Sequence, residues 1–330
     1  MKPPRVVTLT LHPAIDRVIQ ISKMTPGATF DGRELLRVPA GKGVNTARAL
    51  SELLAPAKNI VAAAWLGTNE ARWFSSELRK RNGIQAAICP RACATRFALT
   101  FLEDDGRETH IKECMAPPSE AEQAELLRFW RKTVRRGDIV ALCGSTPAGT
   151  KASTLRSLFT IAREQGAAYI LVDSNGALML EAARAGVDFL KGNAMEIGAW
   201  LKLAHPFDLE NAGHERAIEN AFTKTGAPKT VLITLGAQGA AIASNSKILK
   251  ILPPKLNRRF KIVSATGCGD AATAGVLWSV LLGESRHELA LKRGLACGSA
   301  KLASADPGSL SLKITRSLFN QLQSEYQSEI

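Results

Sequence analysis

The most informative stretch of the chain is Lys261-Ile-Val-Ser-Ala-Thr-Gly-Cys-Gly-Asp270, which continues into Ala271-Ala-Thr-Ala-Gly-Val-Leu277. It predicts a short strand over residues 261–263, a glycine-rich turn and the start of an apolar helix. Glycines in such a turn let backbone N–H groups point at a bound anion, and the helix N-terminus adds positive potential. Asp270 lies inside this positive surrounding, where a carboxylate could accept a proton from a hydroxyl group. The amides that would stabilise charge on a transferred phosphoryl group belong to Gly267, Cys268 and Gly269.

Two other interpretations of this stretch stay open from these residues alone. Gly267-x-Gly269-x-x-Ala272 partly matches a dinucleotide-binding fingerprint. That fingerprint normally opens the first β-α-β unit and is followed by a strand that ends in an acidic residue, whereas helical patterns follow here. Alternatively, Asp270 only caps the helix, because aspartate is common at helix N-termini.

A second glycine segment, Ala40-Gly-Lys-Gly-Val-Asn-Thr-Ala-Arg48, precedes a helical run over Val44–Leu54. Its small residues let the backbone approach a ligand closely. Lys42 supplies a point charge for a phosphate, and Asn45 can donate to and accept from sugar hydroxyl groups. The segment is not a Walker motif, because Val44 stands where that motif requires Ser or Thr. An ordinary glycine turn is the structural alternative.

Short apolar, β-branched runs alternate with helical patterns along most of the chain. This alternation predicts right-handed β-α-β crossovers, and hence an α/β fold with a doubly wound, mainly parallel sheet flanked by helices. Ligands bind such sheets at the carboxyl ends of the strands. Strands are expected at Arg5–Thr10, Ile60–Trp65, Ile84–Cys89, Asp138–Cys143, Ala168–Val172, Val187–Lys191 and Lys229–Thr234. Helices are expected at Asn69–Arg81, Ser119–Val134, Thr150–Gln165, Ala194–Lys202 and His214–Lys224.

Three further segments predict a small β-sheet lid outside the main sheet. Asp16–Ser22 alternates with a period of two, and Arg96–Leu102 and Arg107–Glu113 flank a hairpin turn, Glu103-Asp-Asp-Gly106. The alternative is that they form ordinary edge strands of the main sheet.

The rest of the chain predicts two more strand-like runs and a helical C-terminal part, without a linker or repeat. We therefore expect a single catalytic domain over residues 1–330, with lid strands inserted at about 15–38 and 93–114. The expected elements are Gln238–Ala243, Lys247–Leu252, Gly269–Leu282, Arg286–Ala303 and Thr315–Glu325.

The charge of the chain restricts its partners. Its 330 residues are 45% hydrophobic and carry a net charge of +13 at pH 7. Basic residues gather at Arg128–Arg136, on an amphipathic helical pattern whose charges mark the solvent-facing side, and at Lys255–Lys261. Neither cluster matches a nucleic-acid-binding motif. A solvated basic surface is favoured, and its positive field would help to gather phosphorylated substrates.

The cysteines and the N-terminal residues restrict the location of the chain. Its six cysteines are scattered without a C-x-x-C pair, so neither a zinc site nor a disulfide framework is expected. The apolar run Val6–Leu11 is too short for a signal peptide or for a membrane span of about 20 residues. We expect a cytoplasmic protein with no nucleic-acid and no membrane partner.

Taken together and in order, the two glycine segments resemble the two signatures of the PfkB (ribokinase-like) family of carbohydrate kinases. Thr8-Leu-Thr-Leu-His-Pro-Ala-Ile-Asp16 narrows the resemblance to the phosphofructokinase and tagatose-6-phosphate kinase branch. The resemblance covers essentially the whole chain, and the joint order of the motifs is more specific than either glycine segment. Further matching segments are Thr95-Arg96, Cys143-Gly-Ser-Thr-Pro-Ala-Gly149, Lys191-Gly-Asn-Ala-Met-Glu196 and Ile233-Thr-Leu-Gly-Ala-Gln-Gly239.

The resemblance implies a role for each of these residues. Asp270 would be the catalytic base and Gly267 to Gly269 the anion hole. Lys42 and Arg96 would bind the phosphate of the substrate. Sugar contacts would come from Asp16, Gly41, Gly43 and Asn45, with Ser145 where the chain turns toward the active site. Nucleotide contacts would come from Lys191, Asn193, Thr234, Gly236 and Gly239. Asn193 and Glu196 would organise Mg²⁺, through water.

The function that the resemblance implies is transfer of the γ-phosphoryl group of ATP to a hydroxyl group of a ketohexose phosphate. Fructose 1-phosphate is the first candidate, because the early motifs are commonest in the subgroup that uses it. Tagatose 6-phosphate and fructose 6-phosphate fit the same residues, and a free sugar or nucleoside fits less well. A basic nucleic-acid-binding protein and an NAD-dependent oxidoreductase are the alternatives from other classes. A homodimer through the lid is implied as well.

The sequence departs from the family pattern at several positions. His12 stands where the branch usually has Asn, and Ala40 replaces the first glycine of the early segment. Ala265 and Cys268 replace the usual Thr and Ala around the anion hole. Individually, Asp16 and Arg96 could be surface charges of the lid, and Asn193 with Glu196 an ordinary helix start. None of the departures removes a charged catalytic group.

Overall fold

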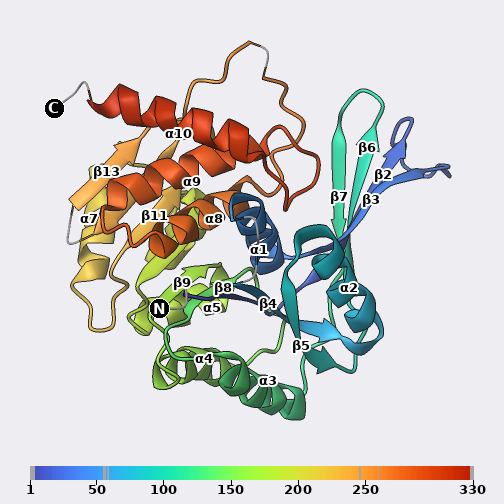
Figure 1. Cartoon of the computed structure of the whole chain (residues 1–330), viewed down its shortest axis with the longest axis horizontal. Coiled ribbons are helices and arrows are strands. Elements are labelled where there is room, and N and C mark those ends of the chain that lie inside the picture. The colour runs from blue at the N-terminus through green and yellow to red at the C-terminus, as the bar shows by residue number, and fades with distance from the viewer. Residues whose placement is uncertain (1–3, 55–56, 58, 245–246, 259, 328–330) are drawn as a thin grey trace.

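The larger of two sheets forms the centre of the molecule (Figure 1). The computed structural model describes residues 4–54, 57, 59–244, 247–258 and 260–327. Within these residues the strand order is β13-β12-β11-β10-β9-β8-β1-β4-β5, and only β12 runs antiparallel to its neighbours. The strands are β1 (Val6–Thr10), β4 (Ile60–Gly67), β5 (Gln85–Arg91), β8 (Ile139–Cys143), β9 (Tyr169–Asp173), β10 (Phe189–Asn193), β11 (Val231–Thr234), β12 (Ala240–Ser244) and β13 (Lys247–Ile251).

Helices cover both faces of this sheet, so its central strands are buried throughout. Every residue of β1 and β4 is buried, and Val6 packs with the helices of one face while Val7 packs with those of the other. One face carries α1 (Lys42–Leu53), α2 (Ala71–Asn82), α8 (Cys268–Leu281), α9 (His287–Lys301) and α10 (Leu312–Gln327). The opposite face carries α3 (Glu120–Thr133), α4 (Ala152–Glu164), α5 (Gly176–Arg184), α6 (Ala194–Leu201) and α7 (Ala212–Phe222). Single 3₁₀ turns form at Thr68–Glu70 and Gly236–Gln238.

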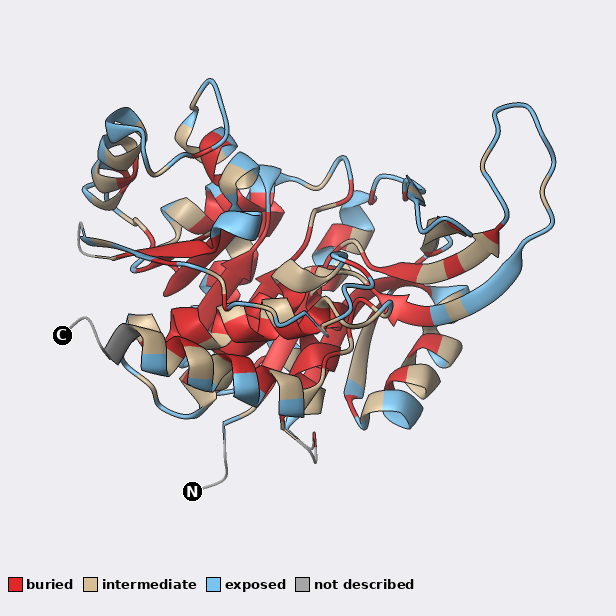
Figure 2. Cartoon of the chain, turned by 90° about the horizontal axis from the view of Figure 1, so that it is seen from above, coloured by how far each residue is buried: buried red, intermediate tan, exposed pale blue. Residues whose placement is uncertain are grey.

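The smaller sheet extends away from the main one, and much of its far end is exposed (Figure 2). Its order among the described residues is β3 (Arg33–Ala40), β2 (Ala14–Ile21), β6 (Arg96–Glu103) and β7 (Glu108–Lys112). β2 pairs parallel to β6, while the β2–β3 and β6–β7 pairs are antiparallel. Gly106, with a φ of 87°, closes the turn between β6 and β7. The predicted separate small sheet is therefore confirmed, and the alternative of edge strands on the main sheet is wrong.

The predicted alternation of strands and helices is confirmed, but one expected strand is absent from the described residues and one helix was not predicted. Residues 261–263 form no strand: the amide of Val263 donates to Leu302 O at 2.7 Å, at the end of a helix rather than in a sheet. α5 was not expected, because its nine residues are too few to show a clear helical period.

The predicted domain limits stay a prediction. Residues 1–3 and 328–330, at the two ends of the predicted range, lie outside the described residues. No helix of the described residues combines the length and the apolar character that crossing a membrane requires.

Candidate active site

One groove, with a volume of about 970 Å³, collects nearly all the predicted site residues. It lies where the carboxyl ends of β10 and β11 meet the first turns of α1 and α8, with β2, β6 and β7 of the small sheet as one wall. This is the edge at which parallel α/β sheets bind ligands. The predicted residues that line it are Asp16, Gly41, Lys42, Asn45, Arg96, Lys191, Asn193, Glu196, Thr234, Gly236, Gly239, Gly267, Cys268, Gly269 and Asp270. Gly43 and Ser145 are not among its lining residues.

Asp270 lies in the first turn of α8 and is only 6% exposed. Its Oδ2 accepts a hydrogen bond from Asn45 Nδ2 at 2.9 Å, which joins the two glycine segments across 225 residues of sequence. Burial raises the pKa of Asp270 to about 6, against the opposing effect of the nearby Lys42 ammonium. A carboxyl group with a pKa close to neutral suits proton transfer in either direction.

The turn before Asp270 has the backbone conformation that the glycine pattern predicted. Gly267 is the residue before the helix and has a φ of 91°, which L side chains rarely adopt. A Cβ atom at Gly267 would also lie 2.2 Å from Pro307 O, so glycine is required there. Cys268 and Gly269 follow as the first helical residues and line the groove. Burial raises the pKa of Cys268, which keeps its thiol protonated.

The second glycine segment places α1 against β1. Gly41, with a φ of 111°, precedes the helix, and a Cβ atom at Gly43 would lie 2.5 Å from Thr10 Oγ1. Gly43 therefore contributes close packing rather than a surface of the groove. Because α1 lies so close to the sheet, Asn45 reaches Asp270 from one side of the groove.

A buried charge cluster, which the sequence did not predict, centres on Asp173 at the end of β9. Asp173 is 0% exposed and accepts hydrogen bonds from Lys191 Nζ at 2.9 Å, Lys42 Nζ at 3.2 Å and Thr273 Oγ1 at 2.6 Å. Burial opposes its charge, but the ammonium groups of Lys191 and Lys42 hold the pKa of Asp173 below its ordinary value. An acidic residue directly after a predicted strand was the available signal.

Lys42 contacts two carboxylates. Its Nζ donates to Asp173 Oδ1 at 3.2 Å and to Glu196 Oε1 at 3.3 Å. Burial alone would lower the pKa of Lys42, but these two carboxylates raise it above its ordinary value. Lys42 is therefore a permanent positive charge on the side of the groove that Asn193 and Glu196 line.

Asp16 and Arg96 enter the groove from the neighbouring strands β2 and β6. Burial raises the pKa of Asp16 to about 7, partly offset by the guanidinium group of Arg48. Arg96 donates through Nη2 to His12 O at 3.0 Å and through Nε to Pro13 O at 3.3 Å, so the backbone fixes the position of its guanidinium group.

His12 and Ser145 lie together behind this side of the groove. His12 Nδ1 is 3.2 Å from Ser145 Oγ, and burial together with Arg96 and Arg91 lowers the pKa of His12 to about 4. His12 is therefore neutral at pH 7. Its Nε2 is buried without a hydrogen-bond partner among the described residues.

Asn193 and Glu196 form a capping box at the start of α6. Asn193 Oδ1 accepts from Glu196 N, and Glu196 Oε2 accepts from Asn193 N, each at 2.9 Å. This is the ordinary helix start that the sequence left open as the alternative for these two residues. It leaves Glu196 Oε1 directed at Lys42. Gly239, with a φ of 90°, brings backbone to the groove at a position where a Cβ atom would lie 2.1 Å from Ile251 O.

Asn193 and Glu196 fit a magnesium ion only when a bound ligand supplies part of its coordination shell. No group of three or more His, Cys, Asp or Glu side chains among the described residues could hold a metal ion. Magnesium commonly uses one or two carboxylates and completes its shell with water and substrate phosphates. The carboxylate of Glu196, which lines the groove beside Asn193, is compatible with that arrangement.

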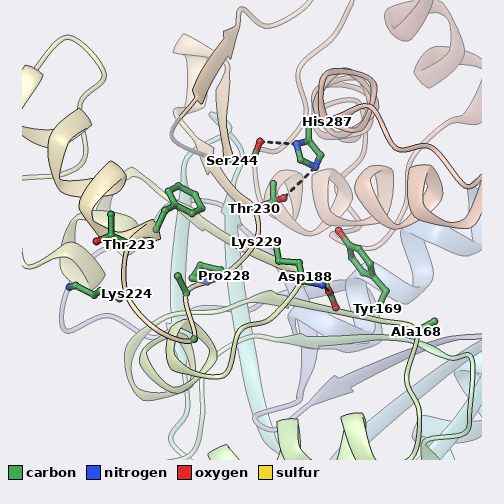
Figure 3. A pocket seen from close by; sticks show the side chains of 13 residues that line it. Ala168, Tyr169, Asp188, Thr223, Lys224, Pro228, Lys229, Thr230, Ser244 and His287 are labelled. Carbon is green, nitrogen blue, oxygen red and sulfur yellow. Dashed lines mark hydrogen bonds and ion pairs between the residues drawn. The ribbon is translucent and has the colours of Figure 1, made fainter.

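A second crevice, of about 860 Å³, lies at the opposite, amino-terminal ends of β9 to β11 (Figure 3). Several of its polar side chains pair with one another. His287 Nδ1 lies 2.9 Å from Ser244 Oγ, and His287 Nε2 lies 3.4 Å from Thr230 Oγ1. Lys229 Nζ donates to Asp188 Oδ1 at 2.7 Å. These groups satisfy each other at the wrong end of the sheet for ligand binding, so the first groove is the candidate active site.

Comparisons with known proteins identify the family and the fold of the chain. A family model described as pfkB family carbohydrate kinase matches residues 10–313. The 1-phosphofructokinase of Xanthomonas campestris pv. campestris is 29% identical over 309 residues, which cover 92% of this chain and 92% of that protein. The tagatose-6-phosphate kinase of Staphylococcus epidermidis is 25% identical over 327 residues, covering 96% of this chain and 98% of the other. A crystal structure of phosphofructokinase-2 from Escherichia coli has a TM-score of 0.86 at 24% identity, covering 97% of this chain and 99% of that one, which confirms the predicted fold class.

The charge cluster generates the first prediction. We expect Asp173→Asn to lower the free energy of unfolding by about 3–5 kcal/mol, because it leaves the buried ammonium of Lys191 without its carboxylate. Urea-induced unfolding measures this change. Asp31→Asn, at an exposed position, is the matched control and should leave the unfolding midpoint unchanged. A loss below about 1 kcal/mol for Asp173→Asn would contradict the cluster's role in stability.

Proposed function

This chain belongs to the pfkB family of carbohydrate kinases, and we propose that it transfers the γ-phosphoryl group of ATP to a hydroxyl group of a ketohexose phosphate. One observation carries the proposal. A buried carboxylate, Asp270, lies in the first turn of α8, beside a groove that Gly267, Cys268 and Gly269 also line, and Asp16 and Arg96 line the same groove. The groove therefore offers a base, an anion hole, an acceptor for sugar hydroxyl groups and a cation for a phosphate.

The chemistry starts at Asp270. Its carboxylate takes the proton from the attacking hydroxyl group, and the hydrogen bond from Asn45 holds it in position. The amides of Gly267, Cys268 and Gly269 stabilise the charge that spreads over the transferred phosphoryl group. Phosphoryl transfer depends mainly on positioning and on charge neutralisation, which is why cations surround a single base.

The acceptor side of the groove supports a phosphorylated sugar. Asp16 can accept hydrogen bonds from sugar hydroxyl groups, and Arg96 has a guanidinium group already fixed by two backbone carbonyls. A fixed guanidinium group suits recognition of a phosphate. The assignment of Lys42 to the substrate's phosphate stays a prediction, since its ammonium contacts Asp173 and Glu196.

Fructose 1-phosphate is the first candidate acceptor. The early sequence motifs favour it, and the Xanthomonas campestris relative is a 1-phosphofructokinase. Tagatose 6-phosphate is the second candidate, because the Staphylococcus epidermidis relative is a tagatose-6-phosphate kinase of nearly the same length. A coupled assay of ADP release separates these candidates over fructose 1-phosphate, fructose 6-phosphate, tagatose 6-phosphate and the free sugars.

The donor side of the groove supports ATP with Mg²⁺. Lys191, Asn193, Thr234, Gly236 and Gly239 line it, together with the apolar side chains of Leu256, Leu295 and Leu302, which suit the face of a nucleotide base. When bound, Mg²⁺ would neutralise phosphate charge, and Glu196 with Asn193 would hold it through water. The homodimer through the small sheet stays a prediction.

The role of the base is tested with Asp270→Asn. We expect kcat to fall roughly 10²- to 10⁴-fold, because the amide cannot accept the hydroxyl proton. The thermal unfolding midpoint and the affinity for a non-hydrolysable ATP analogue should stay close to those of the unaltered chain, since the new side chain keeps the size of the old one. Near-normal turnover would reject Asp270 as the base.

The pKa values of two carboxyl groups predict the dependence of activity on pH. The pKa of Asp16 is raised to about 7 and that of Asp270 to about 6, and both groups act as carboxylates in the proposed mechanism. Activity should therefore be full above both pKa values and fall as the pH drops through them. On a logarithmic plot of kcat/KM the slope should approach two. In Asp16→Asn the slope should fall to one, and an unchanged slope would contradict the role of Asp16.

The phosphate of the acceptor is tested with Arg96→Ala. Loss of a charged hydrogen bond should raise KM for the sugar phosphate roughly ten- to hundredfold, while KM for ATP and for a free sugar changes little. Arg107→Ala, on the exposed hairpin of the same small sheet, is the matched control. It should leave KM for the sugar phosphate and KM for ATP unchanged. Equal KM values for the sugar phosphate in all three proteins would contradict the assignment.

Lys42→Ala separates the two sides of the groove in the same assay. If Lys42 binds the substrate's phosphate, KM for the sugar phosphate should rise as in Arg96→Ala. A fall in kcat with a raised KM for ATP would instead move Lys42 to the donor side, where its ammonium meets Glu196.

A further inference from the structure

Lys301, the last residue of α9, is a buried lysine that the proposed mechanism does not use. Lys301 is 0% exposed, although its side chain carries an ammonium group and lies at the end of a helix that packs on one face of the main sheet. Burial lowers the pKa of Lys301, while the carboxylate of Asp306 favours its charged form. A buried ammonium is costly unless polar groups surround it, so its contacts show what it holds.

The contacts of this ammonium are backbone carbonyls of two different loops. Lys301 Nζ donates to Ser304 O at 2.8 Å and to Ser264 O at 3.3 Å. Ser264 lies in the loop that leads into the anion-hole turn, and Ser304 lies in the loop that follows α9. Two carbonyl oxygens directed at one point repel each other unless a cation lies between them, so the ammonium ties the loops together.

Both loops border the anion hole. Ala265, Thr266 and Gly267 line the groove from the first loop, and Ala305 and Pro307 line it from the second. The loops touch at the turn itself, since a Cβ atom at Gly267 would lie 2.2 Å from Pro307 O.

The second loop is also fixed on its other side. Asp306 Oδ2 accepts from Arg48 Nη2 at 2.5 Å, and Arg48 belongs to α1, the helix that carries Asn45. Asp306 Oδ1 accepts from Gly308 N at 3.0 Å. Among the described residues, the first loop is bonded to this side by the amides of Val263 and Ser264, which donate to Leu302 O, and by the bond from Lys301 to Ser264 O.

The helix that carries Lys301 is closely packed as well. α9 packs along α8, the helix that begins at the anion hole (Figure 1). The two helices approach so closely that a Cβ atom at Gly275 would lie 2.5 Å from Arg293 O. Lys301 therefore projects its ammonium from an element that is fixed relative to Asp270.

We propose that the ammonium of Lys301 is a built-in monovalent cation, which clamps the two loops and so holds the amides of residues 267–269 at the orientation that the transferred phosphoryl group needs. Lys301 is a positioning residue: it acts through the anion hole and touches neither ligand. The proposal rests on the proposed function for its kinetic test. Carbonyl oxygens that converge on one point are also the usual ligands of free potassium-sized ions. The cage formed by the carbonyl oxygens of Ser264 and Ser304 should therefore accept such an ion when the lysine ammonium is removed.

The test compares the unaltered chain with Lys301→Met, which keeps the length of the side chain and removes the charge. Turnover is measured in NH₄Cl, KCl, NaCl and choline chloride at constant ionic strength. We expect the unaltered chain to show the same kcat in all four salts. In Lys301→Met and choline chloride, kcat should fall at least about tenfold, because the anion-hole donors lose their alignment, while KM for the acceptor changes little.

Ammonium and potassium should restore most of the lost kcat of Lys301→Met in a saturable way, whereas sodium and choline should not. Lys292→Met is the matched control on the same helix. Lys292 is also buried, at 3% exposed, but its ammonium pairs with Glu288 Oε1. Its loss should change stability without making kcat depend on the cation.

A second readout does not need activity. The thermal unfolding midpoint of Lys301→Met should rise with NH₄Cl or KCl and not with choline chloride, since the ions refill the cage. A chain without kinase activity that still shows this stabilisation would overturn the proposed function and keep the clamp. Activation of the unaltered chain by potassium or ammonium, or a Lys301→Met protein whose kcat and unfolding midpoint ignore the cation, would overturn the clamp.

Discussion

The hydrogen bond from Asn45 Nδ2 to Asp270 Oδ2 joins the two helix starts on which the site depends. Neither helix could place its residue alone. Asn45 reaches this position because Gly43 lets α1 lie directly against Thr10 of β1. Asp270 reaches it because Gly267 adopts a positive φ and lets the chain turn into α8. The parallel sheet holds both helices on the same face, so the carboxylate, the amides and the groove meet at one edge.

Charge balance is the second constraint on this arrangement. The proposed base, Asp270, needs a raised pKa, and burial supplies it. The same burial would penalise every other charge nearby, and Asp173 offsets this by accepting bonds from both Lys42 and Lys191. The ammonium groups of Lys42 and Lys191 are therefore held in place by a carboxylate that stays ionised. Because Lys42 and Lys191 both donate to Asp173, neither ammonium pairs directly with Asp270, and the Asp270 carboxylate stays available to the groove.

Much of this arrangement could be predicted from the sequence, because it depends on backbone pattern. Alternating strands and helices and the separate small sheet follow from local periodicity, whereas the convergence of the two glycine segments was implied by the family resemblance. Side-chain pairing could not be predicted. The role of Lys42 at the substrate's phosphate stays a prediction, and the contacts of its ammonium with Asp173 and Glu196 could not be foreseen, because these residues come from distant segments. Lys301 has the appearance of an exposed charge at a helix end, where lysine favours the dipole, and only packing buries it.

The account depends on the meeting of acceptor, base and anion hole in one groove. A crystal structure of the Asp270→Asn protein with fructose 1-phosphate and a non-hydrolysable ATP analogue measures this directly. We expect one sugar hydroxyl oxygen within hydrogen-bond distance of the residue 270 side chain, with the terminal phosphate of the nucleotide directed at the amides of residues 267–269. A sugar bound away from that side chain, or a terminal phosphate that points away from the amides, would contradict the account.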